Sequence, residues 1–382
     1  MIKIKYFLIT IALILFSKGF SQNQSNLLFE DYDPPSTLIV KETIITKAKF
    51  PFIDIHNHIF DMNKFDFEAT LLEMEKLNMR IFNNLSGRGF NIERIGDSIT
   101  GIGILDRPYF LKSTPLVDNK IKRNFILFTN IDFSGFDQPQ WLSNTIKSLE
   151  DDINAGAQGL KIYKDLGLTL KDQYGKRIPV SHPKLDAIWK KCGELKIPVL
   201  IHTGEPSSFF QPHDSLNERW LELKQFPSRA RPSTKYPSWE TLMKEQHEVF
   251  KNNPQTIFIN AHMGWMANDL KRLGELLEEI PNMYVEIAAA VAELGRQPIS
   301  ARVFFVKYQD RILFGKDTYK PEEYHTYFRI LESNDEYFKY FRKRHAFWRM
   351  YGLNLPDEVL EKVYYKNALI ILPNIDKSMF NE

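Results

Sequence analysis

Short runs of β-forming residues alternate with longer amphipathic stretches along most of the chain, from about residue 50 onward. A β-rich run followed by polar and apolar positions at helical spacing is the pattern of a parallel βα unit. Eight alternations of this kind favour a closed (β/α)8 barrel, a TIM barrel, over an open sheet. The predicted strands are residues 52–58, 80–85, 124–131, 159–163, 199–203, 257–262, 284–288 and 312–315.

The stretches between these strands predict the helices of the barrel. The clearest are residues 140–155, 182–195, 239–252, 268–279 and 301–308, with a closing helix at residues 358–372. Residues 87–122 show no clean helical pattern, and we expect them to be partly loop. The sequence therefore predicts one barrel domain over residues 50–382, preceded by an irregular segment over residues 22–49.

Residues 1–21 have the pattern of a secretory signal peptide. Lys3 and Lys5 precede an apolar run over residues 6–16, and Gly19 and Ser21 supply the small residues of a cleavage site. This apolar run has about eleven residues, whereas a membrane-spanning helix needs about twenty. We therefore expect an exported protein, periplasmic or extracellular, without a stable membrane anchor after cleavage.

Charge and cysteine content restrict the partners and the source of stability. Loss of the signal peptide would remove three of the 50 lysine and arginine residues and leave 47 against 48 acidic residues. A net charge near zero argues against a nucleic-acid partner, so we expect a small-molecule substrate and leave a homo-oligomer open. Cys192 is the single cysteine, so the fold must depend on its core and not on an internal disulfide.

Residues that suit a metal site stand at the ends of several predicted strands. His56 and His58 lie two positions apart in FIDIHNHIF and share one strand face. His202 and His262 stand near the ends of the fifth and sixth strands, and Asp317 follows the eighth. Any one of these histidines alone is as well explained by a buried, hydrogen-bonded position. Because the strand ends of such a barrel meet at one mouth, we expect all five side chains to gather there around a divalent metal, with zinc the first choice.

The order of these residues resembles the amidohydrolase superfamily, and more narrowly its amidohydrolase-related (amidohydrolase 2) family of metal-dependent TIM-barrel hydrolases. The motifs that carry the resemblance are FIDIHNH, GLKIYKDLGL, LIHTGEP, NAHMGW and LFGKDT, and it extends over about residues 49–373. The resemblance implies that His56, His58 and Asp317 are metal ligands and that His202 completes the site or binds a second ion. It implies that His262 is either a second-metal ligand or a catalytic residue.

Lys161, in the fourth predicted strand, leaves the number of metal ions open. In binuclear members of the superfamily a lysine of this strand is carboxylated by carbon dioxide and bridges two metals, which would make Lys161 a ligand. A bare ammonium group there would repel the ions. The alternatives are that Lys161 binds a substrate carboxylate or pairs with an acid such as Glu286. Lys164, at an odd spacing from Lys161, is expected on the opposite strand face.

The expected chemistry begins with water on the metal. A bound zinc-like ion lowers the pKa of water from about 16 to about 7, and Asp317 would act as general base as well as ligand. The leading hypothesis is a secreted hydrolase that attacks an amide, lactone or ester carbonyl of a small polar substrate. The alternatives are a non-oxidative decarboxylase of a small aromatic or unsaturated acid and a non-catalytic binding protein on the same barrel.

Substrate-binding residues are expected in the loops that follow the strands. The longest loop, residues 205–237, follows the fifth strand and is expected to form a lid or a pocket wall. Its Arg219 is a candidate to hold a carboxylate through the guanidinium group. Glu293 and Arg296 follow the seventh strand at the same barrel end and are further candidate substrate contacts. Lys316 departs from similar chains, which often have a small or hydroxyl residue before the aspartate.

Overall fold

The computed structural model of the protein describes residues 27–95 and 98–380. The predicted signal peptide lies outside these described residues. The described residues fall into two units, of which the first, residues 27–40, contains no helix or strand and the second begins at residue 41. Within the described ranges, no helix has the length and apolar character that crossing a bilayer requires.

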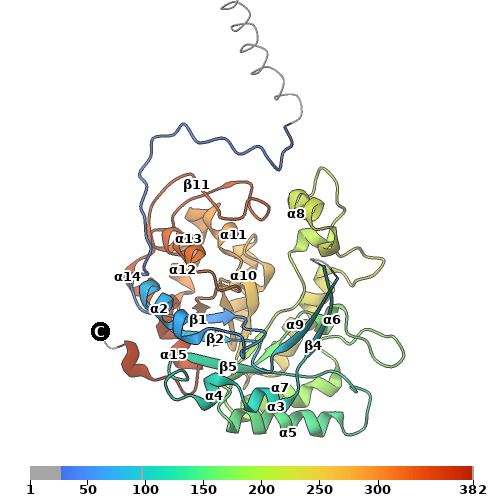
Figure 1. The fold of residues 1–382 in the computed structure, drawn as a ribbon. Coiled ribbons are helices and arrows are strands. Elements are labelled where there is room, and N and C mark those ends of the chain that lie inside the picture. The colour runs from blue at the N-terminus through green and yellow to red at the C-terminus, as the bar shows by residue number, and fades with distance from the viewer. Residues whose placement is uncertain (1–26, 96–97, 381–382) are drawn as a thin grey trace, which may run out of the picture. The chain divides into compact units, whose positions relative to one another are not determined.

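Eight parallel strands of the second unit form the barrel that the sequence predicts (Figure 1). Each strand pairs with its neighbours in chain order. The first and last strands meet as well, because the Ile55 amide donates to the Phe314 carbonyl at 3.1 Å. The fold is therefore a (β/α)8 TIM barrel. Its strands are β1 (Phe52–Asn57), β2 (Met79–Asn84), β5 (Phe125–Asn130), β6 (Gly159–Ile162), β7 (Val199–Ile201), β8 (Phe258–Asn260), β9 (Met283–Glu286) and β10 (Ile312–Leu313).

Alternate strand residues build the two apolar layers of the barrel. Ile53 and Ile55 of β1 belong to the buried cluster inside the barrel. The strand residues between them point outward, toward the helices. Phe52 packs outward, with its ring 4.8 Å from that of Phe314 and 5.5 Å from that of Phe328. Because the side-chain period of a strand is two, these sequences can bury both faces only with helices on the outside.

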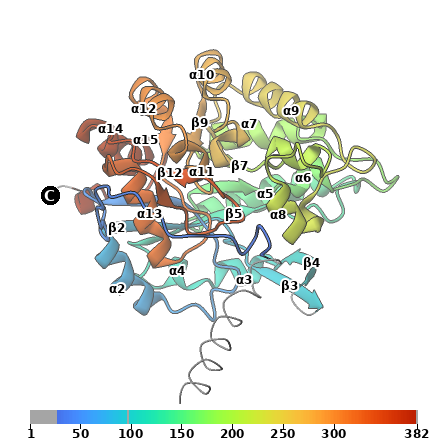
Figure 2. The same cartoon turned by 90° about the horizontal axis from the view of Figure 1, so that it is seen from above.

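The helices form a ring around the strands (Figure 2). Ser238 caps α9 (Trp239–Asn252) by accepting a hydrogen bond from the Thr241 amide, so this helix begins and ends at the predicted residues. The other predicted helices agree to within a few residues. The remaining long helices are α2 (Phe67–Leu77), α5 (Trp141–Asn154), α7 (Asp186–Glu194), α10 (Leu270–Glu279), α12 (Pro298–Lys307) and α13 (Pro321–Glu332).

Two regions differ from the sequence prediction. Residues 87–122 contain an antiparallel hairpin of β3 (Phe90–Ile95) and β4 (Ser98–Ile104), followed by the short helices α3 (Arg107–Leu111) and α4 (Thr114–Val117). Isoleucine-rich runs on both sides of a Gly-Asp pair are a hairpin signal, which a search for helical spacing overlooks. The closing helix is divided into α14 (Asp357–Glu361), a π-helical turn (Lys362–Lys366) and α15 (Asn367–Ile371).

The long loop after β7 is largely ordered into short helical turns. It contains 3-10 turns at Ser207–Phe210 and Pro227–Arg229 and the helix α8 (Trp220–Gln225). After β9 the chain forms the short helix α11 (Val291–Gly295), and after β6 the turn α6 (Asp165–Leu168). These segments follow the carboxyl ends of their strands, so they surround the barrel mouth.

Candidate metal centre

Three predicted ligands converge at the mouth of the barrel. His56 Nε2 lies 3.3 Å from His58 Nε2 and 3.2 Å from Asp317 Oδ1, and His58 Nε2 lies 3.6 Å from the same oxygen. Ligand atoms about 2.0–2.2 Å from a tetrahedral zinc ion lie about 3.3–3.6 Å from one another, by the geometry of the tetrahedron. The three atoms therefore have the spacing that one metal ion requires.

Glu286, at the end of β9, orients the first of these ligands. Its Oε1 accepts a hydrogen bond from His56 Nδ1 at 2.9 Å and from the His262 amide at 2.6 Å, and its Oε2 accepts from the Ala288 amide at 2.5 Å. With its Nδ1 donating, His56 keeps the lone pair of Nε2 for a metal. A buried carboxylate that fixes a ligating imidazole in this way is common in metal sites. Because donors already occupy both Glu286 oxygens, we assign it this orienting role.

Hydrogen bonds from residues after β2 and β6 orient His58. Its Nδ1 lies 2.8 Å from Ser86 Oγ, and Tyr163 lies 2.9 Å from the same hydroxyl and donates to the Leu85 carbonyl at 3.0 Å. Tyr163 therefore acts on His58 through Ser86. The second nitrogen of the imidazole remains directed at Asp317.

His202 and His262 form a second pair of nitrogen atoms. His262 Nδ1 donates to the Ala288 carbonyl at 2.8 Å, so its Nε2 carries a lone pair that faces His202 Nδ1 at 3.3 Å. The Nε2 atom of His202 is buried and has no hydrogen-bond partner among the described residues. A metal could bind between His202 Nδ1 and His262 Nε2, whereas His202 Nε2 would still need another partner.

A left-handed turn carries His262 into the site. After β8, residues His262, Met263, Gly264 and Trp265 have φ values of 56°, 55°, 60° and 55°. Each non-glycine residue in this conformation costs about 1–2 kcal/mol, so other contacts must stabilise the turn. The hydrogen bond from the His262 amide to Glu286 is one such contact. Backbone strain is thus concentrated at a candidate ligand.

Burial keeps three of the imidazoles neutral, and hydrogen bonds keep the Asp317 carboxylate charged. Burial lowers the pKa of His58 and of His262 to about 4, and burial also holds the pKa of His202 well below its ordinary value. For Asp317, burial favours a raised pKa, but hydrogen bonds with His56 and His58 lower it well below the usual range. Neutral imidazoles beside an ionised carboxylate are the protonation states in which these groups bind a metal.

The pKa of His56 itself is raised. Burial and the Lys161 charge act to lower this pKa, but the Glu286 and Asp317 carboxylates outweigh them. In return, His56 holds the pKa of Glu286 below its ordinary value, although burial favours the opposite. The buried His56 and Glu286 side chains therefore interact strongly, and Glu286 makes His56 a more basic ligand.

Asp54 and Lys316 lie beside the ligands but point elsewhere. Asp54 accepts hydrogen bonds from Tyr324 at 2.6 Å and from the Lys316 amide at 3.1 Å, which ties β1 to the segment after β10. The Lys316 ammonium is buried and lies 2.5 Å from Glu323 and 5.2 Å from the Phe341 ring centre. Its charge is neutralised away from the metal ligands, so the unusual residue before Asp317 leaves the ligand set intact.

Lys161 reaches the interior of the barrel. It lies in register with Leu200 of β7 and Ile259 of β8, which belong to the interior cluster of the barrel. Lys161 is 1% exposed. Its ammonium nitrogen has no hydrogen-bond partner among the described residues and lies 5.5 Å from the Tyr163 ring centre. Lys164, by contrast, is half-exposed and pairs with Glu205 at 2.6 Å. The two lysines therefore face different surroundings, although Lys164 lies beyond the end of β6 and not on its opposite face.

The three predicted substrate residues form an ion-pair cluster at the rim. Glu293 lies 2.5 Å from an Arg219 nitrogen and 2.6 Å from an Arg296 nitrogen. Arg219 also donates to the His345 carbonyl, while Arg296 pairs with Glu218 and covers the Trp348 ring. Arg219 and Glu293 line a cavity of about 160 Å³ together with His262 and Trp265, whereas Arg296 is not part of its lining. Their contact with a substrate remains a prediction.

A larger cavity lies at the mouth on the side of β5 and β6. It has a volume of about 650 Å³ and lies between the hairpin and the segments that follow β5 and β6. Its walls are mainly apolar, with Phe90, Ile104, Phe133 and Leu166 among them, and Lys161 and Tyr163 line it as well. The candidate ligands from β1, β7, β8 and β10 thus lie between two cavities.

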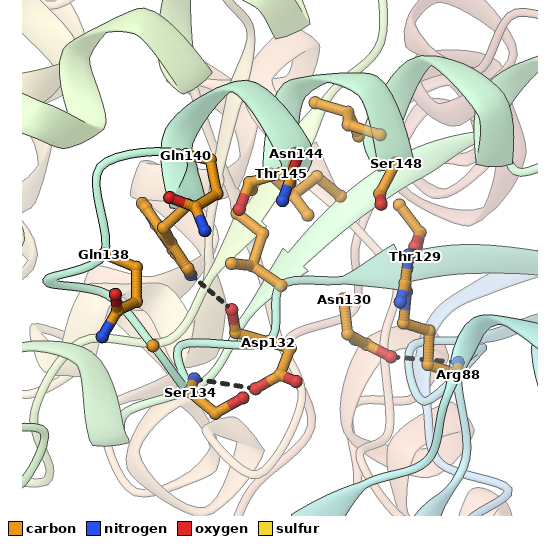
Figure 3. Close-up of a pocket in the computed structure, with 15 residues that line it drawn as sticks. Arg88, Thr129, Asn130, Asp132, Ser134, Gln138, Gln140, Asn144, Thr145 and Ser148 are labelled. Carbon is orange, nitrogen blue, oxygen red and sulfur yellow. Dashed lines mark hydrogen bonds between the residues drawn. The ribbon is translucent and has the colours of Figure 1, made fainter.

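A third cavity lies between the end of β5 and helix α5 (Figure 3). It has a volume of about 330 Å³ and is lined by polar side chains such as Asn144, Thr145 and Ser148. Of its charged residues, Arg88 is paired with Asp152 at 2.7 Å, and Asp132 accepts a hydrogen bond from the Ser134 amide at 2.8 Å. None of the predicted site residues lines this cavity, so it is separate from the candidate metal centre.

Sequence reasoning missed the role of some residues in this site. Glu286 was considered only as a partner of Lys161, and Ser86, Tyr163 and Trp265 were not considered as parts of the site. The signal for Glu286 was a carboxylate at the end of a buried apolar strand, where charge is rare unless it is paired. No comparable signal marks Ser86, because a serine after a strand is common.

Comparison with known families gives one match. The family model described as amidohydrolase matches residues 129–373. The matched region contains His202, His262 and Asp317, whereas His56 and His58 lie before it. No curated protein matches the chain.

Several solved structures share the fold at low sequence identity. A candidate amidohydrolase from Staphylococcus aureus is 14% identical, with 85% of this chain and 99% of that chain covered and a TM-score of 0.50. An uncharacterised TIM-barrel protein from Bordetella bronchiseptica is 13% identical, with 80% and 82% covered and a TM-score of 0.48. The 2,6-dihydroxybenzoate decarboxylase from Rhizobium is 13% identical, with 87% and 98% covered and a TM-score of 0.47. At these identities the likeness concerns the fold.

Proposed function

The chain belongs to the amidohydrolase family of metal-dependent enzymes, and we propose that it is a hydrolase that attacks an amide, lactone or ester carbonyl of a small molecule with metal-activated water. One observation carries this proposal. The ligand atoms of His56, His58 and Asp317 lie 3.2–3.6 Å apart, and the Asp317 side chain is 37% exposed at the mouth. The carboxylate can therefore serve the metal and still reach a water or a substrate.

The residues that would hold the metal fit it in number and in kind. His56, His58 and Asp317 would bind one divalent ion, and His202 and His262 would complete its coordination or bind a second ion. A bound ion would supply an acidified water and a polarised carbonyl. Three or more imidazole ligands favour zinc, although the same donors suit manganese, iron or cobalt.

Asp317 has the proton-transfer role in this proposal. Its low pKa keeps it ionised at neutral pH, so its free oxygen accepts a proton from the attacking water and returns it to the leaving group. Glu286 holds His56 in the tautomer that binds the metal. His262, neutral because of burial, faces the same space and is the second candidate catalytic residue.

The test measures metal content and reaction type together. Purified protein loaded with zinc should contain at least one ion per chain and should hydrolyse members of an ester, lactone and amide panel in ¹⁸O-labelled water, with one label in the acid product. Removal of the metal by a chelator should abolish turnover, and zinc should restore it. A protein that binds no ion would contradict the proposal and leave a binding protein on the barrel fold as the remaining hypothesis.

Non-oxidative decarboxylation of an aromatic or unsaturated acid is the second candidate. The apolar cavity beside Lys161 favours it, because such a space suits a ring that carries a carboxylate. Carbon dioxide release without incorporation of labelled oxygen would identify this reaction. The same panel, extended with aromatic acids, therefore separates the two candidates.

The setting of the reaction is proposed from the sequence. Residues 1–21 support an exported protein, periplasmic or extracellular, and the balanced charge supports a small-molecule substrate with no nucleic acid. Mass analysis of the protein recovered from the native cell would test export, since cleavage should leave a chain that begins near residue 22.

A further inference from the structure

The cavity of about 650 Å³ has two chemically different parts. Its wall is built from Phe90 and Ile104 at the hairpin, Ile131 and Phe133 after β5, and Leu166 in the turn after β6. These side chains carry no charge, although the acidic residues Asp132 and Asp165 line the same cavity. A flat or bulky apolar group placed among them would remove their surface from water, which is the main source of affinity in such cavities.

The inner end of this cavity holds a buried amine. Lys161 enters the cavity lining from β6, where its nitrogen is buried and has no acceptor among the described side chains and carbonyls. The carboxylates Asp317 and Glu286 act on it through space and favour its charged form, although burial lowers its pKa to about 7. A buried amine without an acceptor costs free energy unless a ligand supplies one.

Two other lysines at the mouth, unlike Lys161, are paired with carboxylates of the protein. Lys316 is also buried, but it lies 2.5 Å from Glu323. Lys164, three residues from Lys161, is paired with Glu205 at 2.6 Å. The protein thus supplies a carboxylate to each of these two lysines and none within hydrogen-bonding distance to Lys161.

We infer that Lys161 binds the anionic group of a substrate whose apolar body, such as an aromatic ring, fills the adjoining cavity. This inference rests on the proposed function, since the bound acid lies beside the candidate metal ligands. Lys161 is then a specificity-determining residue that selects carboxylates over neutral molecules, and the wall around Phe133 and Leu166 selects apolar bodies over small hydrophilic acids.

Calorimetric titration of the zinc-loaded protein, prepared without bicarbonate, tests the inference with benzoate as the probe. Benzoate should bind, whereas acetate, which lacks the apolar body, and benzamide, which lacks the charge, should bind at least tenfold more weakly. Lys161→Met should weaken benzoate binding by about ten- to one hundredfold, the usual range for loss of a hydrogen bond to a charged group. Lys164→Met is the matched control and should leave benzoate affinity unchanged.

Metal content and thermal stability are read on the same samples. Lys161→Met should keep the metal content of the parent and raise the thermal midpoint, because it removes an unpartnered buried amine. A fall from two ions to one in this variant, with a carbamate signal after exposure to ¹³C-bicarbonate, would make Lys161 a carboxylated ligand and overturn the inference while the proposed function stands. Equal benzoate binding in parent and variant would also overturn it, and absence of metal in the parent would contradict the proposed function alone.

Discussion

The floor of the barrel mouth and its rim differ in whether their charged groups are paired within the protein. On the floor, the ligand nitrogens of four histidines and an oxygen of Asp317 face a common space, and His202 Nε2 and Lys161 Nζ are buried without partners among the described residues. On the rim, the charges are matched: Glu205 pairs with Lys164 and Arg231, and Glu293 pairs with Arg219 and Arg296.

This difference indicates where a ligand belongs. Buried charged groups in folded proteins are normally paired by the protein itself, so the unpaired amine of Lys161 marks a place where something else can bind. The arginines of the rim looked equally available in the sequence. In the structure Arg219 and Arg296 both have carboxylate partners, so their predicted contact with a substrate is untested.

Asp317→Asn should produce the largest effect on the floor. It removes the ionised oxygen that binds the metal and accepts the proton, so turnover should fall by about 10²–10⁴-fold. The backbone should be unaffected, because Asp317 has a φ of 81° and asparagine tolerates the left-handed region. Steady-state kinetics with saturating zinc would measure this, and full turnover in the metal-replete variant would exclude the proton-transfer role.

Glu286→Gln should lower metal affinity, whereas a matched substitution on the rim should not. Loss of the carboxylate beneath His56 should weaken metal affinity by about 10–100-fold, measured by competition with a chromogenic chelator. Glu205→Gln is the matched control, since Glu205 is equally buried but pairs with the rim cations Lys164 and Arg231. If both substitutions lowered metal affinity alike, the distinction between floor and rim would be lost.

Gly315→Ala should disturb the floor by sterics alone. An added Cβ would lie 2.6 Å from a Glu286 oxygen and 3.0 Å from His56 Cβ, so these groups must shift. We expect a loss of about 1–3 kcal/mol in the free energy of unfolding, with weaker metal binding as well. Chemical denaturation and metal titration would measure both. Gly103→Ala is a suitable control, because no heavy atom lies within 4 Å of its added Cβ.

Arg296→Ala should have the smallest effect on chemistry. It removes the pairs with Glu218 and Glu293 and the contact with Trp348, which should cost about 1 kcal/mol of stability because the group is partly exposed. The kcat value should stay close to that of the parent. A raised KM with unchanged stability would instead give Arg296 a direct substrate contact.

Sequence patterns predicted the barrel because its signals are local. Each strand is a buried apolar run bounded by turn residues, and each predicted ligand stands at the end of such a run, where barrel geometry alone determines the meeting point. The hairpin of β3 and β4 was not predicted, because it takes the place of a helix in the second βα unit of the barrel. The roles of Glu286 and Ser86 depend on which side chain reaches which nitrogen, and spacing along the chain carries no information about that.

The partners of Arg219 and Arg296 could not be predicted for a related reason. Both arginines bind glutamates that are contributed by the loops after β7 and β9, whose conformations depend on contacts between loops. The sequence shows that acids and bases are present there in similar number. It does not show which charges are matched within the protein and which are left for a ligand.

The closure of the barrel has a consequence for how the protein matures. His56 and Asp317 come from the first and the last strands, and the Asp317 amide donates to the His56 carbonyl at 2.6 Å. A growing chain that lacks the last strand holds the two histidines of β1 without their carboxylate. Contacts between such distant segments form late, so the complete ligand set exists only in a chain that has finished folding. Metal uptake would therefore report completion of the fold.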